Sequence, residues 1–167
     1  MEKEVVEDFI DFLHLVVGEG NKSDELILFR GQSDSFPLLP TIARGNTNVD
    51  MRRVEQSMLE QLKRRSRTVI SKNLNDHWDW LVYAQHFGMK TRLLDWTSNP
   101  LVALWFAATE AIKSGNDAYV YVLEVEKRMI LNKKDNPTQW SFTRTQVFKP
   151  DVNNERILAQ EGGFTAH

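Results

Sequence analysis

The fold is decided by residues 84–107, which read AQHFGMKTRLLDWTSNPLVALWFA. The stretch begins in a helix, which we predict over 77–87, with Asp76 as its N-cap and Gly88 as the residue that stops it. Residues 91–96 are rich in apolar side chains and are predicted to be extended. A helix, a tight glycine turn and a strand therefore follow one another within a short length of chain.

The second half of this stretch predicts another helix. Ser98 or Asn99 is its expected N-cap, and Pro100 falls in the first helical turn, where a proline has no hydrogen bond to lose. The residues that follow, LVALWFAATEAI at 101–112, are apolar nearly all round, so we expect this helix to be central. Soon after it, DAYVYVLEV at 117–125 is the clearest strand of the chain, rich in valine and tyrosine.

The N-terminal segment predicts an amphipathic helix over 3–17. Its apolar residues recur at spacings of three and four, as one face of a helix requires. Gly18 and Gly20 are expected to end it. The face expected to be buried consists of Val6, Phe9, Ile10, Leu13, Val16 and Val17.

A strand, a loop and a helix are expected next. Leu26–Phe29 is a short apolar run typical of a buried strand, and it places Arg30 at its end. Residues 32–48 are rich in Ser, Pro, Gly and Asn, which favours a loop with at most one helical turn. A second helix is predicted over 50–66, capped by Asp50. The inner face of that helix is expected to hold Val54, Met58, Leu59 and Leu62.

The end of the chain gives weaker signals. SFTRTQVF at 141–148 is a candidate strand. The pair Asn153-Asn154 starts a short predicted helix that runs to Gln160, and we expect Gly162-Gly163 to end it. The chain then stops at His167 without a closing element, so we expect the natural protein to be longer.

Composition indicates one folded domain. The 167 residues are 41% hydrophobic and 26% charged, which is ordinary for a globular protein and enough for a single core. With the predicted elements, this indicates a single α+β domain over 1–167, with its core over about 25–167. Its helices are expected to pack on a small mixed or antiparallel sheet.

Several classes of protein are excluded by composition. The chain has no cysteine, which excludes disulfide bonds and thiolate zinc sites. Its four histidines lack the spacing of metal ligands, so we expect no metal. No run of about 18 apolar residues is present, and the acidic N-terminus lacks the order of a signal peptide. We therefore expect a cytoplasmic protein without membrane contact.

Charge is unevenly distributed along the chain. The net charge of −2 argues against bulk attraction to polyanions. Residues 52–67 nevertheless hold six cations and two acids over about four helical turns. A helix of this kind could contact nucleic-acid phosphates, or it could be an ordinary solvated face. The cations are Arg52, Arg53, Lys63, Arg64, Arg65 and Arg67.

The first cluster suited to chemistry is Phe29-Arg30-Gly31-Gln32. A guanidinium group binds phosphates and carboxylates through two parallel hydrogen bonds. The missing side chain of Gly31 would let a ligand approach the backbone closely. The alternative is a structural arginine paired with a buried acid.

The second cluster, 85–98, reads QHFGMKTRLLDWTS. It gathers an amide, an imidazole, cations, a carboxylate and hydroxyls around one glycine turn. His86 could act as a general base or hydrogen-bond donor, or it could simply cap and pack the helix end. The other candidate binding residues, which could instead form a local ion pair or helix caps, are Gln85, Arg92, Asp95, Thr97 and Ser98.

A third cluster lies over 155–167. It reads as a polar surface helix closed by two glycines. Glu155, Gln160 and His167 would nevertheless suit a ligand site, which keeps this segment among the candidates.

Together these clusters resemble the FRG domain of bacterial and phage proteins. That family is named for an aromatic-Arg-Gly motif, here Phe29-Arg30-Gly31. Its further motifs are matched by residues 84–97, 99–107 and 156–164. The resemblance covers the chain from about residue 25 to the end. It implies a role as a toxin or phage-defence effector.

The order of elements is more distantly similar to ADP-ribosyltransferases of the Arg–Ser–Glu type. This resemblance implies that Arg30 binds the phosphate or ribose of NAD. It also implies that Thr97 and Ser98 stand at the hydroxyl position of the pocket, and that Glu155 is the catalytic acid. Such a carboxylate stabilises the positive charge that builds on the ribose as nicotinamide leaves.

The chain departs from that enzyme pattern in two places. Asp95-Trp96-Thr97-Ser98 replaces the Ser-Thr-Ser strand. Glu155-Arg156-Ile157 replaces the Glu-x-Glu or Gln-x-Glu pair, and Glu161 competes with Glu155 for the role of acid.

Two hypotheses of function follow. The first is an enzyme-like domain that binds NAD or a similar nucleotide and transfers ADP-ribose to a macromolecular acceptor. The second is a non-catalytic domain that recognises nucleic acid or a partner protein through Arg30, Arg92 and the basic helix. A metal-free nuclease using His86 and Arg92 ranks below both. For the first, the candidate catalytic residues are Arg30, His86 and Glu155, and the candidate binding residues are Arg30, Gly31, Gln85, Arg92, Asp95, Thr97, Ser98 and Gln160.

Overall fold

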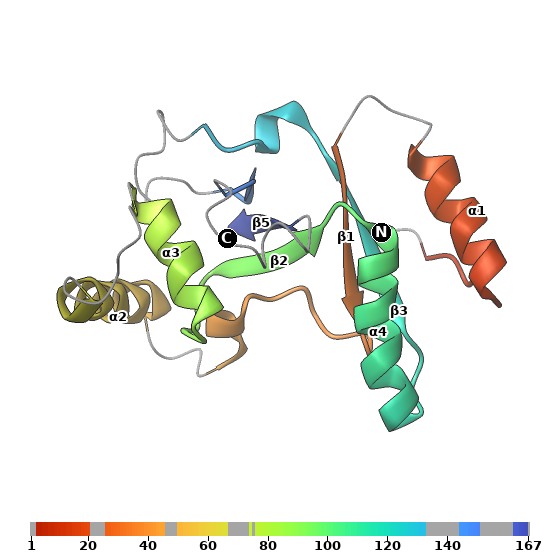
Figure 1. Ribbon diagram of the computed structural model, residues 1–167, viewed down its shortest axis with the longest axis horizontal. Helices are drawn as coiled ribbons and strands as arrows, with labels where there is room; N and C mark the ends of the chain where they lie inside the picture. The colour runs from red at the N-terminus through yellow and green to blue at the C-terminus, as the bar shows by residue number, and fades with distance from the viewer. Residues whose placement is uncertain are drawn as a thin grey trace.

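The α+β prediction is confirmed by four helices packed on a five-stranded sheet (Figure 1). The computed structural model describes residues 3–20, 26–45, 50–66, 74, 76–132, 144–150 and 162–166. The helices are α1 (Phe9–Gly20), α2 (Met51–Ser66), α3 (His77–His86) and α4 (Pro100–Ser114), with short 3-10 turns η1 (Thr41–Arg44) and η2 (Lys127–Met129). The strands are β1 (Leu26–Gln32), β2 (Leu93–Thr97), β3 (Tyr119–Val125), β4 (Gln146–Phe148) and β5 (Gly162–Ala166).

The sheet has the order β3-β1-β2-β5-β4, and neighbouring strands are antiparallel. β1 pairs with β3 along all of its residues, and β2 pairs with β5 along all of its own. β1 and β2, by contrast, pair at Phe29 and Thr97. The sheet is therefore two halves that meet at one point, and Figure 1 shows β1 running across the direction of β2.

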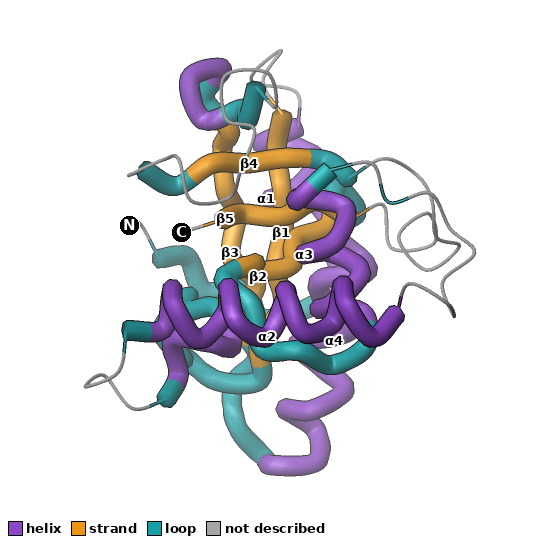
Figure 2. The backbone as a smooth tube through the Cα atoms, turned by 90° about the vertical axis from the view of Figure 1, so that its left-hand side faces the viewer, coloured by secondary structure: helices purple, strands orange, loops and turns teal. Residues whose placement is uncertain are grey.

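Helices cover the sheet in two groups. α3 packs on the β2–β5–β4 half, where Trp78 and Leu81 join Phe148 and Phe164 in one buried cluster. In Figure 2, α2 and α3 lie in front of these strands. α4 and α1 cover β1, where Phe29 packs with Ala103. Among the described residues, no helix combines the length and apolar character needed to cross a membrane.

The unit predicted over 84–107 is present, and its caps explain its boundaries. The Asp76 side chain accepts a hydrogen bond from the backbone N–H of Asp79 at the start of α3. Gly88 has a φ of +86°, so only a residue without a Cβ takes this turn at low cost. Asn99, one of the two expected caps, accepts from the backbone N–H groups of Leu101 and Val102.

The N-terminal helix differs from the prediction over 3–17. α1 starts later, because the Asp8 carboxylate accepts hydrogen bonds from the backbone N–H groups of Ile10 and Asp11 and so acts as the cap. It also continues past Gly18. The expected inner face is confirmed at Val16, which is buried together with the unpredicted Phe12, but four of the expected residues are exposed. These four are Val6, Phe9, Ile10 and Val17.

The expectation that α4 is central is also wrong. One side of α4 consists of Ala103, Ala107 and Ala111, all buried. These small residues let the helix approach the sheet closely. Its opposite side is left open, with Trp105 61% and Ile112 81% exposed. α4 is therefore a surface helix whose apolar character is not explained by burial.

The C-terminal segment holds the largest error. Gly162-Gly163 does not close a helix but begins β5, an inner strand paired with β2 and β4. Glycine is a poor strand residue, yet Gly163 lies in this strand beside the Leu28 side chain, whose methyl groups would be 3.6 Å from a Cβ built there. The candidate strand 141–148 is shorter than expected and forms β4. The helix predicted from Asn153-Asn154 to Gln160 lies outside the described residues.

Candidate functional site

A pocket of about 530 Å³ opens where the two halves of the sheet separate. Its walls come from β1, β2, the end of α3 and the first turns of α4. Because β1 and β2 pair at Phe29 and Thr97, their backbones diverge beyond that point and leave the space between them to side chains. The pocket is thus a consequence of the topology. The predicted site residues that line it are Arg30, Gly31, Gln85, His86, Asp95 and Thr97.

Arg30 bridges the two diverging strands. It lies inside β1, not at its end as expected, and its Nη1 donates a hydrogen bond of 2.7 Å to the backbone carbonyl of Asp95. A side chain thus replaces the ladder hydrogen bond that the separated backbones do not make. The Nε of Arg30 is buried and has no hydrogen-bond partner among the described residues. A buried N–H donor without a partner is costly and marks a place where a ligand can bind.

The charge of Arg30 is held in an unfavourable setting. Burial lowers the pKa of Arg30 below its ordinary value, Asp95 opposes this effect, and the neighbouring Arg44 adds to it. A guanidinium nevertheless stays protonated in proteins. The unfavourable burial of its charge therefore favours the binding of an anion beside it. The alternative prediction was that Arg30 pairs with a buried acid. Among the described residues, Arg30 contacts the backbone carbonyl of Asp95 and lies near the charge of that residue.

Gln85 positions the carboxylate of Asp95. Its Nε2 donates a hydrogen bond of 2.8 Å to Asp95 Oδ1, and its Oε1 accepts one from the hydroxyl of Thr91. Thr91 Oγ1 in turn accepts from the backbone N–H of Leu93 at 3.2 Å. Both ends of the Gln85 amide are therefore used, which locks the end of α3 to the start of β2. Gln85 is a positioning residue for the pocket.

Arg92 lies outside the lining of the pocket. Its Nε is 2.6 Å from Glu55 Oε2, and its backbone N–H donates to Glu55 Oε1 at 2.7 Å. Glu55 is fully buried, and Arg92 is 8% exposed. This ion pair fastens α2 to β2. The pairing with a buried acid that was considered for Arg30 is thus found for Arg92.

Thr97 and Ser98 differ in their position relative to the pocket. Thr97 lines the pocket, and its Oγ1 accepts a hydrogen bond from the backbone N–H of Asn99 at 3.1 Å. Its hydroxyl thereby supports the start of α4, as one alternative for this pair expected. Ser98 is not one of the lining residues. His86 lines the pocket from the end of α3, with its ring edge-on to Phe87 at 5.0 Å between centroids.

The packing of α4 on β1 requires a glycine at position 31. A Cβ built at Gly31 would lie 1.9 Å from the carbonyl oxygen of Ala103 and 2.8 Å from the backbone nitrogen of Ala107. Both atoms belong to the backbone of α4, which therefore crosses β1 in direct contact. Gly31 therefore makes room for a helix, and it also lines the pocket, so its predicted role in admitting a ligand stays a prediction.

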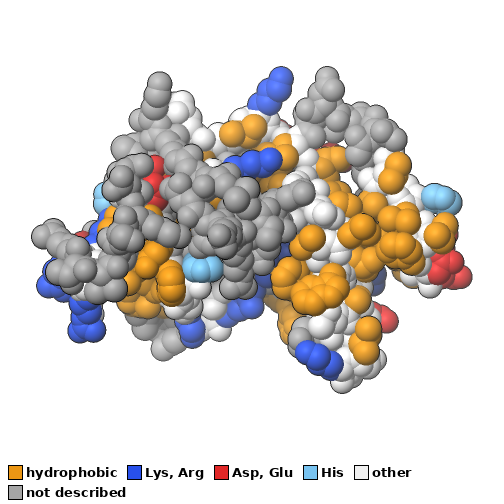
Figure 3. Space-filling view, viewed as in Figure 1, with side chains coloured by type: hydrophobic (Ala, Val, Ile, Leu, Met, Phe, Trp, Pro, Cys, Tyr) orange, Lys and Arg blue, Asp and Glu red, His pale blue; other side chains and the backbone are white. Residues whose placement is uncertain are grey.

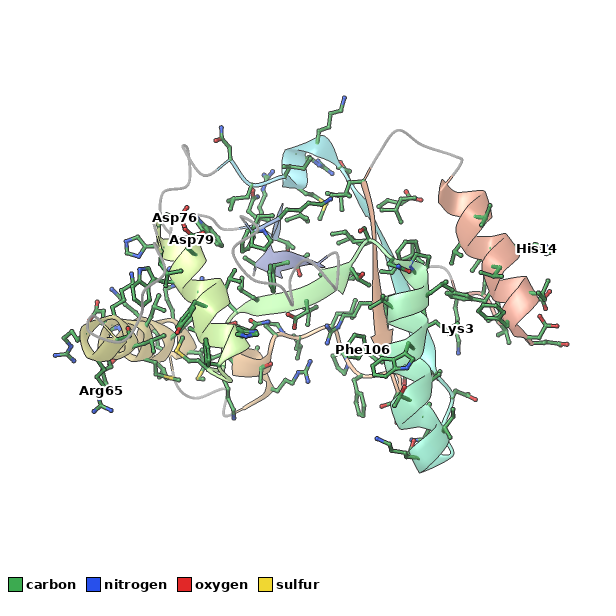
Figure 4. All side chains as sticks on the ribbon, viewed as in Figure 1. Lys3, His14, Arg65, Asp76, Asp79 and Phe106 are labelled. Atoms are coloured by element: carbon green, nitrogen blue, oxygen red, sulfur yellow. The ribbon has the colours of Figure 1, made fainter. Side chains whose placement is uncertain are left out.

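Of the lining residues that sequence reasoning missed, three bear on what the pocket can bind. Phe36, from the loop after β1, is 56% exposed, and Phe106, from α4, is 44% exposed. Figure 4 shows Phe106 on the side of α4 that faces this loop. Arg44, from η1, adds a second cation. An aromatic pair or a lone arginine in a loop has no periodic signal, so only the structure could place them in one pocket.

The backbone at Phe36 is held firmly although its ring is exposed. Its carbonyl accepts hydrogen bonds from Gln32 Nε2 at 2.9 Å and from the Tyr121 hydroxyl at 3.3 Å. These two donors come from neighbouring strands, β1 and β3. The ring is thus presented at the mouth of the pocket from a fixed backbone, which suits a binding residue.

The basic helix presents its charges in several directions. At about 100° per residue, Arg52 and Lys63 fall near one direction, Arg53 and Arg64 near a second, and Arg65 on a third. Lys63 Nζ is 3.0 Å from His77 Nδ1, and Arg53 is 3.3 Å from Asp50. Figure 4 shows Arg65 at the outer end of α2. Arg64 and Arg65, with Gln61, line a shallow surface hollow there. Arg67 lies outside the described residues.

The remaining candidates of the third cluster lie outside the described residues. They are Glu155, Gln160, Glu161 and His167. Within the part of the chain that the structure describes, no group of three or more histidine or acidic side chains is arranged to hold a metal ion.

Comparison with known proteins places this site in one family. The family model described as the FRG domain matches residues 25–116, which is more than half of the chain. The matched region contains β1, α3, β2 and α4, and so every residue that lines the pocket except Phe164 of β5. Curated proteins and solved structures gave no match to this chain.

Proposed function

We propose that this chain, which belongs to the FRG domain family, binds NAD or a related nucleotide in the pocket around Arg30. The observation that carries the proposal is the guanidinium of Arg30, which bridges β1 and β2 with its Nε buried and unpartnered among the described residues. Guanidinium groups held in this way bind phosphate oxygens by charge-assisted hydrogen bonds.

The charges of the pocket favour an anion. Arg30 and Arg44 contribute two positive charges, and Asp95 contributes one negative charge. The carboxylate of Asp95 is already hydrogen-bonded to Gln85. The balance is positive, which attracts a phosphate and disfavours a metal cation or an amine.

The rim of the pocket favours a planar ring. Phe36 and Phe106 both line it and are both partly exposed to solvent. Aromatic side chains bind planar heterocycles through stacking and edge contacts. Phosphate-binding arginines below an aromatic rim are what a nucleotide requires, since it carries both an anionic and a flat apolar part.

ADP-ribosyl transfer to a macromolecule, in a toxin or phage-defence setting, is the reaction that we propose for this site. It rests on the resemblance to ADP-ribosyltransferases and assigns Glu155 as the acid. Asp95 is a second carboxylate, and it lines the pocket itself. Incubating variants with labelled NAD and a cell lysate, as the source of acceptor, distinguishes these two carboxylates. Glu155→Gln abolishes labelling if Glu155 is the acid, and Asp95→Asn abolishes labelling if Asp95 is the acid.

The Arg30→Gln variant is expected to lose nucleotide binding. In a thermal-shift titration, NAD should raise the melting temperature of the wild-type domain saturably by a few degrees, because a ligand that binds only the folded state stabilises it. Arg30→Gln should need at least about tenfold more NAD for the same rise. Arg53→Gln, which removes an exposed arginine on α2, is the matched control and should respond like wild type.

The proposal fails if NAD, ADP-ribose and ADP all leave the wild-type melting temperature unchanged up to millimolar concentration. It also fails if Arg30→Gln, folded by circular dichroism, responds like wild type. A variant that does not fold at all is replaced by Arg30→Lys, which keeps the charge and loses the two-pronged geometry.

The hollow at the outer end of α2 supports a second hypothesis, recognition of nucleic acid. Under it, reversing both charges with Arg64→Glu and Arg65→Glu should abolish binding to a mixed-sequence oligonucleotide, and wild-type affinity should fall steeply with salt. Arg30→Gln should then have little effect in a filter-binding assay. Equal oligonucleotide binding by wild type and the reversed variant would contradict this hypothesis.

A further inference from the structure

Two arginines from different elements line the same pocket. Arg30 comes from the middle of β1, and Arg44 comes from the last position of η1. Each is fixed by one hydrogen bond to a backbone carbonyl: Arg30 Nη1 to Asp95 at 2.7 Å and Arg44 Nε to Leu39 at 2.9 Å. A guanidinium has five N–H donors, so one such bond orients the group and leaves donors for a ligand.

The two cations are close enough to repel. Arg44 is among the causes that lower the pKa of Arg30, after burial and against the opposing effect of Asp95. Arg44 is itself exposed, yet its positive charge acts on the half-buried Arg30, because both side chains line the same pocket. Holding the Leu39 loop would not by itself require a second cation at this place.

Among the described residues that line the pocket, the acidic charge does not balance this pair. Asp95 provides one carboxylate against two guanidinium groups, and Gln85 already holds one oxygen of that carboxylate. A ligand that brings two adjacent negative charges would relieve the repulsion that a single charge leaves in place. A diphosphate group carries its charges on two linked phosphorus centres and offers oxygens to both arginines.

We propose that Arg30 and Arg44 form a two-cation clamp for a diphosphate group, and that Arg44 makes the pocket select nucleoside diphosphates and dinucleotides over monophosphates. The clamp rests on the proposed function for the nucleoside part of the ligand. It does not depend on whether the domain transfers ADP-ribose.

Isothermal titration calorimetry with ADP, AMP and adenosine tests the clamp. Wild type should bind ADP about tenfold or more tightly than AMP, the scale expected for one added charge-assisted contact. In Arg44→Gln this preference should fall to about twofold or less, because the second phosphate loses its partner. Arg44→Lys keeps the charge without the fork and should fall between the two. Arg53→Gln should keep the wild-type preference.

Titration with inorganic pyrophosphate and phosphate separates this inference from the proposed function. If pyrophosphate binds in preference to phosphate, and Arg44→Gln removes that preference, the clamp stands even when no nucleoside is recognised. If ADP and AMP bind to the pocket with the same ratio in wild type and Arg44→Gln, the clamp is wrong although the nucleotide site stands. Unliganded melting temperatures of the Arg44 variants confirm that the loop anchored at Leu39 is intact.

Discussion

The Gly31→Ala variant is expected to lose about 3 kcal/mol or more of its free energy of unfolding. Its new Cβ would lie 1.9 Å from the Ala103 carbonyl oxygen, a separation that atoms cannot share. The obstacle is helix backbone, so it cannot be relieved by turning a side chain. α4 would have to move off β1 and take Ala103 and Ala107 with it, which breaks the close contact that these small residues allow.

Urea unfolding followed by circular dichroism measures this loss, and Gly163→Ala is the matched control. Gly163 is also a glycine in an inner strand, but a Cβ there would be 3.6 Å from the Leu28 side chain, an ordinary contact. We expect that control to stay within about 1 kcal/mol of wild type. Equal midpoints for Gly31→Ala and wild type would show that α4 does not approach β1 as described.

The Glu55→Gln variant is expected to lose about 3–5 kcal/mol, the second large effect. The substitution keeps the shape of the side chain and removes the charge that faces Arg92. The guanidinium of Arg92, which is 8% exposed, then loses the negative charge of Glu55 at 2.6 Å. An isolated buried charge costs far more than a surface pair contributes.

Thermal and urea unfolding of Glu60→Gln provide the control for this prediction. Glu60 lies on the same helix but is exposed, so its replacement should change stability by less than about 0.5 kcal/mol. The double variant Glu55→Met/Arg92→Met should recover part of the loss, since an apolar pair of similar volume needs no counter-charge, while the backbone N–H of residue 92 loses its acceptor. A Glu55→Gln protein as stable as Glu60→Gln would contradict the buried ion pair.

Two residues of the family motifs, Gly31 and Arg92, have roles in the fold. Gly31 and Arg92 both lie in stretches that the FRG resemblance covers, and both were candidates for ligand binding. The structure gives each a packing or pairing partner: the α4 backbone for Gly31 and Glu55 for Arg92. Arg30 lies in the same motif and lines the pocket as Gly31 does, but its Nε is buried without a partner among the described residues.

The parts of the fold that could be predicted are those set by local chemistry. Asp76 and Asn99 cap their helices, and Gly88 makes its turn, because each acts on backbone within a few residues of itself. The errors arose where the partner is far away in sequence. β5 was missed because a glycine in the sequence signals a break in regular structure. The contact between Gly163 and Leu28, which are far apart in the sequence, is seen in the structure. Glu55 is buried in contact with Arg92, the residue just before β2.

The candidate site could be predicted in part for the same reason. Arg30, Gln85, His86 and Asp95 stood out as polar groups in apolar surroundings, and they do share a pocket. Their hydrogen bonds, such as Arg30 to the Asp95 carbonyl, depend on how two strands diverge and could not be read from spacing. Phe36, Phe106 and Arg44 were missed because their role depends on the pocket that other elements create.

The pocket accounts for only part of the exposed apolar surface of α4. Figure 3 shows hydrophobic side chains gathered over α4 and α1 on one face of the molecule. Phe106 contributes to the rim of the pocket, whereas Trp105 and Ile112 do not line it. The titrations with Arg30 and Arg44 variants do not involve this face, so their outcome is independent of what it contacts.

A crystal structure of the domain grown with NAD tests the central claim most directly. We expect electron density for a diphosphate between Arg30 and Arg44, with one of its oxygens within about 3 Å of Arg30 Nε, the donor that is otherwise buried without a partner. The flat ring of the ligand should lie against Phe36 or Phe106. A well-ordered structure from saturating NAD in which the pocket around Arg30 holds only water, with NAD absent or bound elsewhere, would contradict the account.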